Sequence, residues 1–276
     1  MTRFFVCILL LQLLYVSYSL RSNAKVLVLG GTGFVGRAFI EEALKQCPQL
    51  EITSISRRGR RKDDKEDRVR WVAGDANLVV GNVIDKYGPF DACIHTIGLL
   101  LDNESGLSSF NKFASGSGST PDTSSTYDYV TRQTAFTAIE RLRKQVIRSN
   151  IPSSQKSDLP FVFVSAAEAG WTFKVPIEWL SKYLDAKRSV EVELETSQDI
   201  LRPVVFRPSL IWQVERPQAL PSVLPFYIGS AIRLPFVDRP VLLSSLVKAM
   251  VTSLRDESVT GVQRFNDIDR LSLRKF

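Results

Sequence analysis

The chain has 276 residues, of which 44% are hydrophobic and 24% charged, and its net charge at neutral pH is +7. This length and apolar content suffice for one enzyme-sized domain and exclude general disorder. The positive charge suits anionic cofactors, but no nucleic-acid recognition motif accompanies it, so we expect no nucleic-acid partner. Three cysteines and one histidine exclude a disulfide framework and argue against a metal site.

Residues 1–24 have the pattern of a removable targeting segment. Arg3 precedes an apolar run at 4–16, and small residues follow at Ser17 and Ser19. The run is shorter than the roughly 20 residues that span a bilayer, so an uncleaved anchor is the less favoured reading. By itself the pattern favours a secretory-type signal, and a two-part plastid signal would begin in the same way.

A short apolar run at 25–29 leads into glycines spaced three apart. Gly30 would allow a tight turn, Gly33 would let the backbone approach a pyrophosphate, and Gly36 would let the following helix pack closely. The run and the helical spacing of apolar residues after Gly36 predict a strand, a turn and a helix. We include Thr32, Phe34 and Val35 of the same turn in the candidate cofactor site; the alternative is an ordinary glycine-closed connection.

Further short apolar runs alternate with helical patterns along the chain. The expected strands are 52–56, 69–72, 90–96, 161–165 and 204–207, and the expected helices are 34–45, 78–86, 127–149 and 179–197. This alternation predicts an α/β fold, a Rossmann-type doubly wound parallel sheet, with residues 25–207 as its dinucleotide-binding core.

Two stretches interrupt the alternation. Residues 102–126 are rich in Ser and Gly, which predicts either a mobile loop over the ligand edge of the sheet or a surface insertion. Residues 216–240 carry five prolines but are too apolar for a linker. We assign them to a small C-terminal substrate lobe, residues 208–276, that completes the same domain; a membrane-contacting surface is the alternative.

The residues after the second expected strand indicate the cofactor. NAD enzymes usually place an acidic residue there, but this chain has Arg57 and Arg58. Guanidinium groups suit a 2′-phosphate, so NADP (NADPH) is favoured over NAD. A solvated basic loop, balanced by the acidic residues at 63–67, is the alternative.

A second group of residues lies downstream. Ser165 ends the fifth expected strand, and Tyr183 and Lys187 stand four apart on one face of the next helix. With the glycine turn, these residues resemble the short-chain dehydrogenase/reductase superfamily over most of residues 25–265. Other matching segments contain Asp75, Ala76, Thr96 and Gly98, together with Arg207-Pro208.

The resemblance implies roles for these residues. Tyr183 would exchange a proton with the substrate, Lys187 would lower the pKa of the tyrosine and hold the nicotinamide ribose, and Ser165 would orient the substrate oxygen. Asp75 lies where the family contacts adenine. Thr131 departs from the family pattern, which usually has an asparagine there. We do not expect the buried-strand residue His95 to be a catalytic base.

More narrowly, the segments 94–100, 164–167 and 183–191 resemble an atypical branch of the superfamily. This branch includes reductase-like proteins associated with coenzyme Q biosynthesis and the nucleotide-binding accessory subunit of respiratory complex I. The resemblance implies a mitochondrial protein that acts on an apolar carbonyl or quinone-pathway substrate. It also leaves open a non-catalytic accessory subunit of a membrane-associated complex.

Overall fold

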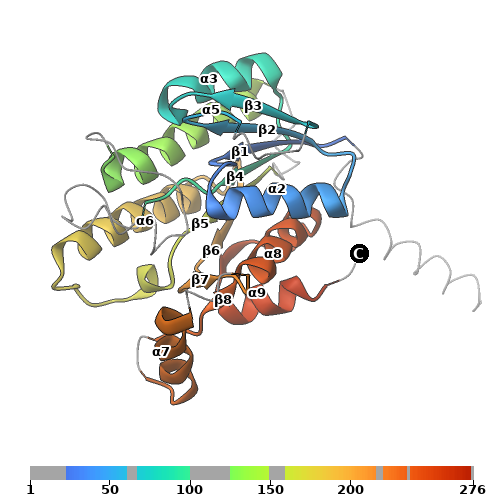
Figure 1. The fold of residues 1–276 in the computed structure, drawn as a ribbon. Helices are drawn as coiled ribbons and strands as arrows, with labels where there is room; N and C mark the ends of the chain where they lie inside the picture. Colours follow the sequence, from blue (N-terminus) through green and yellow to red (C-terminus); the bar gives the residue numbers. More distant parts are fainter. Residues whose placement is uncertain are drawn as a thin grey trace, which may run out of the picture.

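The computed structural model describes residues 23–60, 67–99, 125–148, 159–215, 220–234 and 237–274. The expected targeting segment, apart from residues 23–24, and most of the expected loop at 102–126 lie outside these ranges, as does Arg216. The central feature is a parallel sheet of seven strands in the order β3-β2-β1-β4-β5-β6-β9 (Figure 1). Its strands are β1 (Lys25–Leu29), β2 (Glu51–Ser56), β3 (Val69–Ala73), β4 (Ala92–His95), β5 (Pro160–Val164), β6 (Arg202–Phe206) and β9 (Gly261–Gln263).

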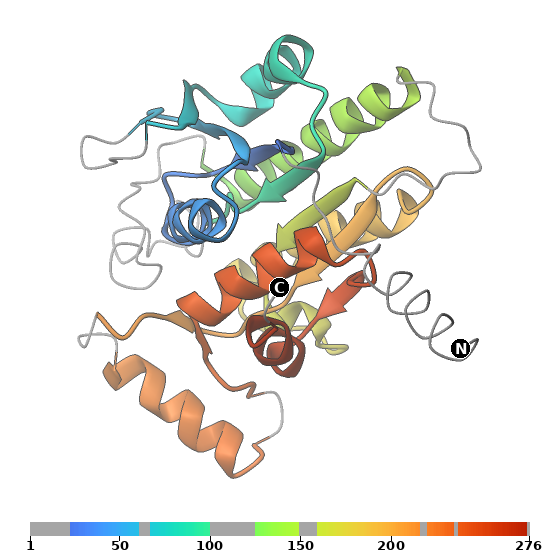
Figure 2. The same ribbon diagram turned by 90° about the vertical axis from the view of Figure 1, so that its right-hand side faces the viewer.

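Helices cover both faces of the sheet, which confirms the predicted doubly wound α/β fold. Helices α2 (Phe34–Gln46), α8 (Leu243–Arg255) and α9 (Phe265–Ser272) lie on one face. Helices α3 (Ala76–Tyr87), α5 (Thr134–Arg148) and α6 (Glu178–Thr196) lie on the other (Figures 1 and 2). The strand order reverses between β1 and β4, and sheets of this kind bind ligands at that point.

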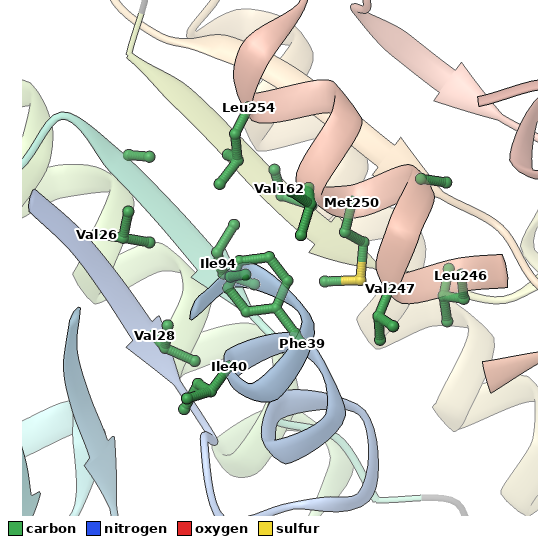
Figure 3. Packing of buried hydrophobic residues seen from close by; sticks show 14 of the residues in the cluster. Val26, Val28, Phe39, Ile40, Ile94, Val162, Leu246, Val247, Met250 and Leu254 are labelled. Carbon is green, nitrogen blue, oxygen red and sulfur yellow. The ribbon is translucent and has the colours of Figure 1, made fainter. Parts of the chain in front are cut away.

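Successive side chains of the buried strands point to opposite faces of the sheet, so each face has its own hydrophobic core. Val26 and Val28 of β1 join the cluster under α2 and α8, whereas Leu27 and Leu29 join the cluster under α3 and α5. Figure 3 shows the first cluster, where Phe39 of α2 packs between strand residues and Met250 of α8. Because both faces are covered, β1 is apolar throughout, as expected for a central parallel strand.

The expected helix at 127–149 begins differently from the prediction. Its first turns form a π-helical segment, η2 (Asp128–Gln133), and regular α-helix starts only at Thr134. π-helical turns are uncommon and are often found at functional sites. The short 3₁₀ segment η3 (Ala167–Gly170) follows β5, in a stretch for which the sequence predicted no regular element.

The C-terminal part divides in two. Strand β9 belongs to the main sheet, since it pairs with β6. Helices α8 and α9 belong to the layer that covers one face of this sheet, since α8 packs on α2 and α9. Strands β7 (Ile211–Trp212) and β8 (Val241–Leu242) form a separate parallel pair. Between them, α7 (Leu220–Ala231) stands away from the sheet (Figures 1 and 2).

Candidate functional site

The glycine turn has geometry that side chains would disrupt. Gly30 has a φ of +91°, which L-residues rarely adopt. A Cβ on Gly36 would lie 2.3 Å from the Gly30 carbonyl oxygen and 2.7 Å from Thr96 Oγ1. Gly33 is the residue before the first turn of α2, and it has no side chain with which to cap that helix start. The start of α2 therefore suits an anion, because the helix dipole favours negative charge there.

A cleft opens at the carboxyl ends of β1 and β4, in front of this turn. Predicted cofactor residues that line it are Gly30, Thr32, Gly33, Arg57, Arg58, Asp75, Ala76, Thr96 and Gly98. Residues that the sequence analysis missed also line it: Ser56, Gly74, Ile97, Leu99, Ser125, Tyr129, Val130 and Thr134. The predicted residues Phe34, Val35, Gly36 and Lys187 are not part of the lining. The side chains of Phe34 and Val35 pack against the core under α2.

Arg57 and Arg58 reach the cleft from the end of β2. Both side chains are exposed, and the turn that contains them is fixed by the hydrogen bond from Ser56 Oγ to the Gly59 carbonyl at 2.8 Å. Gly59 itself has a φ of +65°. The turn thus places two guanidinium groups beside the glycine turn, where a phosphorylated ribose would need positive charge.

The side chain of Asp75 builds one wall of the cleft. One carboxylate oxygen accepts the Asn77 backbone N–H at 2.9 Å and caps α3, and the other accepts the Tyr129 hydroxyl at 2.8 Å. Asn77 also donates its side-chain amide to the Tyr129 carbonyl at 3.2 Å. The first turn of α3 therefore holds Tyr129 of η2 at two points.

Ser165 lies directly after β5. Its backbone N–H donates to the Phe206 carbonyl at 2.7 Å, which extends the pairing of β5 with β6 by one residue. The side chain is only 4% exposed, and among the described residues its hydroxyl has no hydrogen-bond partner. A buried hydroxyl of this kind favours a site that receives a polar ligand atom.

Lys187 connects the Ser165 region with the cleft. Its Nζ donates to the Val164 carbonyl at 2.8 Å, and a Cβ on Gly98 would lie 3.3 Å from the same atom. Nζ also lies 4.9 Å from the centre of the Phe163 ring. The side chain is 4% exposed, and burial lowers the pKa of Lys187 to about 8, against a smaller opposite effect of Glu191.

Tyr183 is partly buried on the same face of α6. Its ring packs edge-on against Tyr127 with centroids 5.6 Å apart, and Lys187 Nζ lies 5.8 Å from its centre. Burial raises the pKa of the Tyr183 phenol, and Glu168 and Tyr127 raise it further. The resemblance implied that Lys187 would lower this pKa. In the structure the Lys187 ammonium donates a hydrogen bond to the Val164 carbonyl. The pKa of Tyr183 is raised because burial and Glu168 disfavour the phenolate.

His95 belongs to the core beneath the site. The ring is fully buried, its Nε2 bonds Thr134 Oγ1 at 2.9 Å, and Nδ1 has no partner within the described ranges. Burial and the neighbouring Lys187 lower the pKa of His95 to about 3. A neutral, enclosed imidazole does not serve as a base for a substrate in the cleft.

Other candidate groups have structural surroundings. Cys47 and Cys93 are free and buried, and burial raises the pKa of both thiols. Thr131 lies buried in η2, and its hydroxyl has no partner in the part of the chain that the structure describes. The same part contains no cluster of three His, Cys, Asp or Glu side chains able to hold a metal ion.

Comparison with solved structures shows that the chain has the fold of NAD(P)-dependent short-chain dehydrogenases/reductases and epimerases. ElxO with NADP bound superposes with a TM-score of 0.58 at 14% identity, covering 88% of this chain and 96% of ElxO. A short-chain dehydrogenase family protein from Francisella tularensis gives 0.56 at 15% identity, covering 88% and 97%. UDP-glucose 4-epimerase from Thermus thermophilus with NAD gives 0.56 at 16%, covering 87% and 76%.

Among curated proteins, the chain is similar to MIOREX complex component 2 of Saccharomyces cerevisiae. The two are 24% identical over 253 residues, which cover 84% of this chain and 87% of the yeast protein. No protein-family model matches the sequence. The neighbours bind NADP or NAD, so the fold is that of proteins with a nicotinamide cofactor.

Proposed function

We propose that this protein is an NADP-dependent oxidoreductase of the short-chain dehydrogenase/reductase type. The observation that supports it best is the position of Lys187, whose Nζ lies against Gly98 of the cleft, against the strand end that carries Ser165, and beside the Tyr183 ring. These contacts support a catalytic group beside the predicted nucleotide cleft.

The residues around the cleft fit a dinucleotide phosphate. The first turn of α2 offers N–H groups to the diphosphate, and a Cβ on Gly36 would collide with the turn. Arg57 and Arg58 would hold the 2′-phosphate, and Lys187 the nicotinamide ribose. When bound, the nicotinamide supplies hydride chemistry, while the protein supplies binding, orientation and electrostatics.

Side chains of this protein would orient the substrate oxygen and donate a proton to it. The Ser165 hydroxyl, buried and without a described partner, would donate a hydrogen bond to that oxygen. Tyr183 would donate its phenolic proton to the same oxygen. Because Lys187 has a pKa of about 8, it is mostly protonated at neutral pH and its charge would favour the tyrosinate that remains.

We further propose a mitochondrial role with an apolar carbonyl or quinone-pathway substrate. The support is the likeness to the yeast MIOREX complex component and the apolar character of 216–240. Fractionation of cells that express the full chain, with N-terminal sequencing of the mature protein, tests the compartment. A full-length cytosolic product would contradict it.

The catalytic proposal is tested by substrate-dependent oxidation of NADPH by the purified protein. The panel should contain quinones, quinone precursors and apolar ketones, with NADH as the alternative reductant. We expect at least one compound to be reduced, faster with NADPH than with NADH. NADPH that binds tightly without turnover on any compound would favour the second candidate below.

The second candidate is a non-catalytic accessory subunit that uses the nucleotide to stabilise its fold. Two observations favour it: the pKa of Tyr183 is raised rather than lowered, and the yeast relative is named as a complex component. A bound nucleotide stabilises a protein by mass action without any reaction. If Tyr183→Phe and Lys187→Ala restore function fully in cells that lack the endogenous homologue, and Gly33→Val does not, this candidate replaces the enzyme.

A further inference from the structure

Helix α7 is the most apolar exposed element that the structure describes. Its twelve residues contain no charged side chain. The uncharged stretch is longer in sequence, since no Asp, Glu, Lys or Arg occurs between Arg216 and Arg233. The helix stands outside the sheet and its covering helices (Figures 1 and 2). A surface helix of a globular protein ordinarily carries a polar outer face, which α7 lacks.

The inner side of α7 is fixed to the body. Val223 is 1% exposed, and the Tyr227 ring packs edge-on against Trp212 with centroids 6.1 Å apart. The Trp212 indole N–H donates to the Tyr227 hydroxyl at 3.3 Å. Gly229 lies close to Val237, where a Cβ would be 3.0 Å from Val237 Cγ1. These contacts determine which side of α7 faces outward.

The outward side is a strip of large apolar side chains. Leu224, Ile228 and Ile232 are spaced four apart and are 58%, 54% and 65% exposed. Residues with this spacing lie on one side of a helix. Ile232, the residue after α7, continues the row because its N–H donates to the Ile228 carbonyl at 3.0 Å. Phe226 and Leu234 are also exposed, outside this row. A row of large exposed apolar side chains is typical of an interaction surface, unlike a single exposed leucine.

The surroundings of the strip favour a lipid surface. Arg233 is exposed at the end of the strip, where its guanidinium can pair with lipid phosphates. The chain as a whole has a net charge of +7. None of the helices that the structure describes is long and apolar enough to cross a bilayer, so α7 would lie along the surface.

We propose that α7 docks the protein onto a membrane rich in acidic phospholipids, with Leu224, Ile228 and Ile232 inserted at the headgroup boundary and Arg233 paired with lipid phosphates. This docking does not depend on the proposed catalytic function. Apolar burial supplies attraction to any bilayer, and the positive charge adds the preference for acidic lipid.

A label at position 228 tests the insertion directly in the full chain. In a Cys7→Ser background the remaining cysteines, Cys47 and Cys93, are buried. Ile228→Cys would carry an environment-sensitive nitrobenzoxadiazole label, and Val192→Cys, on α6 and similarly exposed at 58%, is the matched control. With acidic phospholipid vesicles we expect a blue shift and brighter emission at 228 and neither at 192. An unchanged signal at 228 on vesicles that carry the protein would overturn the proposal.

Vesicle cosedimentation of charge variants gives an independent readout. Leu224→Asp with Ile228→Asp should weaken binding to acidic vesicles by roughly tenfold or more, because charged groups do not enter the headgroup boundary. Leu78→Asp with Val192→Asp adds the same charge at exposed sites elsewhere and should have little effect. Unchanged NADPH binding would show that the α7 variant is folded.

Three results would contradict lipid docking. Equal binding of both double variants would show that α7 is not the contact, and equal binding of wild type to neutral and acidic vesicles would remove the role of charge. A concentration-dependent change at 228 without vesicles, abolished by the aspartates, would show that the strip contacts a second copy of the chain instead.

Discussion

Asp75 and Thr96, which the sequence analysis assigned to the nucleotide end of the candidate site, differ from Ser165 at the catalytic end in how far their side chains are hydrogen-bonded. At the nucleotide end, both Asp75 carboxylate oxygens accept hydrogen bonds and Thr96 Oγ1 donates to the Leu29 carbonyl at 2.9 Å. At the catalytic end, the Ser165 hydroxyl has no partner among the described residues, and the pKa values of Lys187 and Tyr183 are displaced in opposite directions.

Hydrogen bonds within the chain therefore hold the Asp75 and Thr96 side chains in place, whereas the Ser165 hydroxyl is left to bond a ligand. Groups that are hydrogen-bonded within the chain hold the shape of a cleft, whereas buried polar groups without partners raise the free energy of the fold and are typical of functional sites. Changes at the nucleotide end should therefore affect binding and folding, and changes at the catalytic end should affect pH dependence and turnover.

The largest effect is expected for the glycine turn. Gly36→Ala would place a Cβ 2.3 Å from a backbone oxygen that cannot move aside, so the fold should lose about 3 kcal/mol or more. Gly33→Ala is the matched control, since its Cβ meets only the Gly30 carbonyl, at 3.0 Å. It should retain thermal stability but weaken NADPH binding. Equal thermal unfolding of the two variants would contradict this account of the turn.

Lys187 should make stability depend on pH at the catalytic end. Its pKa in the fold is about 8, against 10.5 for an ordinary lysine. The unfolded chain therefore binds more protons between these values, and stability rises with pH across that window. Denaturant titrations at several pH values measure the free energy of unfolding. Between the two pKa values this free energy should rise by about 3 kcal/mol more in the wild type than in Lys187→Met. Parallel pH profiles would mean that Lys187 is solvated.

Arg57 and Arg58 should determine cofactor preference with an intermediate effect. Replacing both by Ala should weaken NADPH binding by roughly 10- to 100-fold, the range expected from the loss of charge-assisted hydrogen bonds to a phosphate. NADH, which lacks that phosphate, should bind as before. Calorimetric titration of both nucleotides measures this, and an equal loss for NADH would indicate a disrupted turn rather than lost phosphate contacts.

The smallest effect concerns Glu168. Its carboxylate follows burial among the causes that raise the pKa of Tyr183, so Glu168→Gln should lower that pKa. Ultraviolet titration of phenolate, with Tyr183→Phe subtracted to isolate the residue, would show the direction. A pKa of Tyr183 that stays the same would show that Glu168 does not contribute to the shift.

The sequence predicts the sheet well because its signals are local. Each central strand is a short apolar run, and the glycine turn after β1 is visible as a spacing. It does not predict η2, whose Tyr129 is held by Asp75 and Asn77, more than fifty residues earlier in the chain. Strand β9 has three residues, too few for a recognisable pattern.

The site shows the same division. The sequence predicts where Arg57 and Arg58 lie because they come directly after β2. It predicts that Tyr183 and Lys187 share one face of a helix because they are four residues apart. The pKa of Tyr183 could not be predicted, because it depends on burial and on Glu168 in η3, a segment without a recognisable period. Tyr129 and Thr134 of the cleft lining were missed for a related reason, since only the tertiary fold brings η2 and α5 to the glycine turn.

The most direct test of the central claim is the Tyr183→Phe variant, assayed for NADPH binding and for substrate-dependent NADPH oxidation. The ring that packs on Tyr127 is retained and only the hydroxyl is lost. We predict NADPH affinity and thermal stability close to wild type, with turnover reduced by roughly 10²- to 10⁴-fold, as for loss of a positioned acid or base. Turnover equal to wild type would contradict the assignment of Tyr183 as the proton donor.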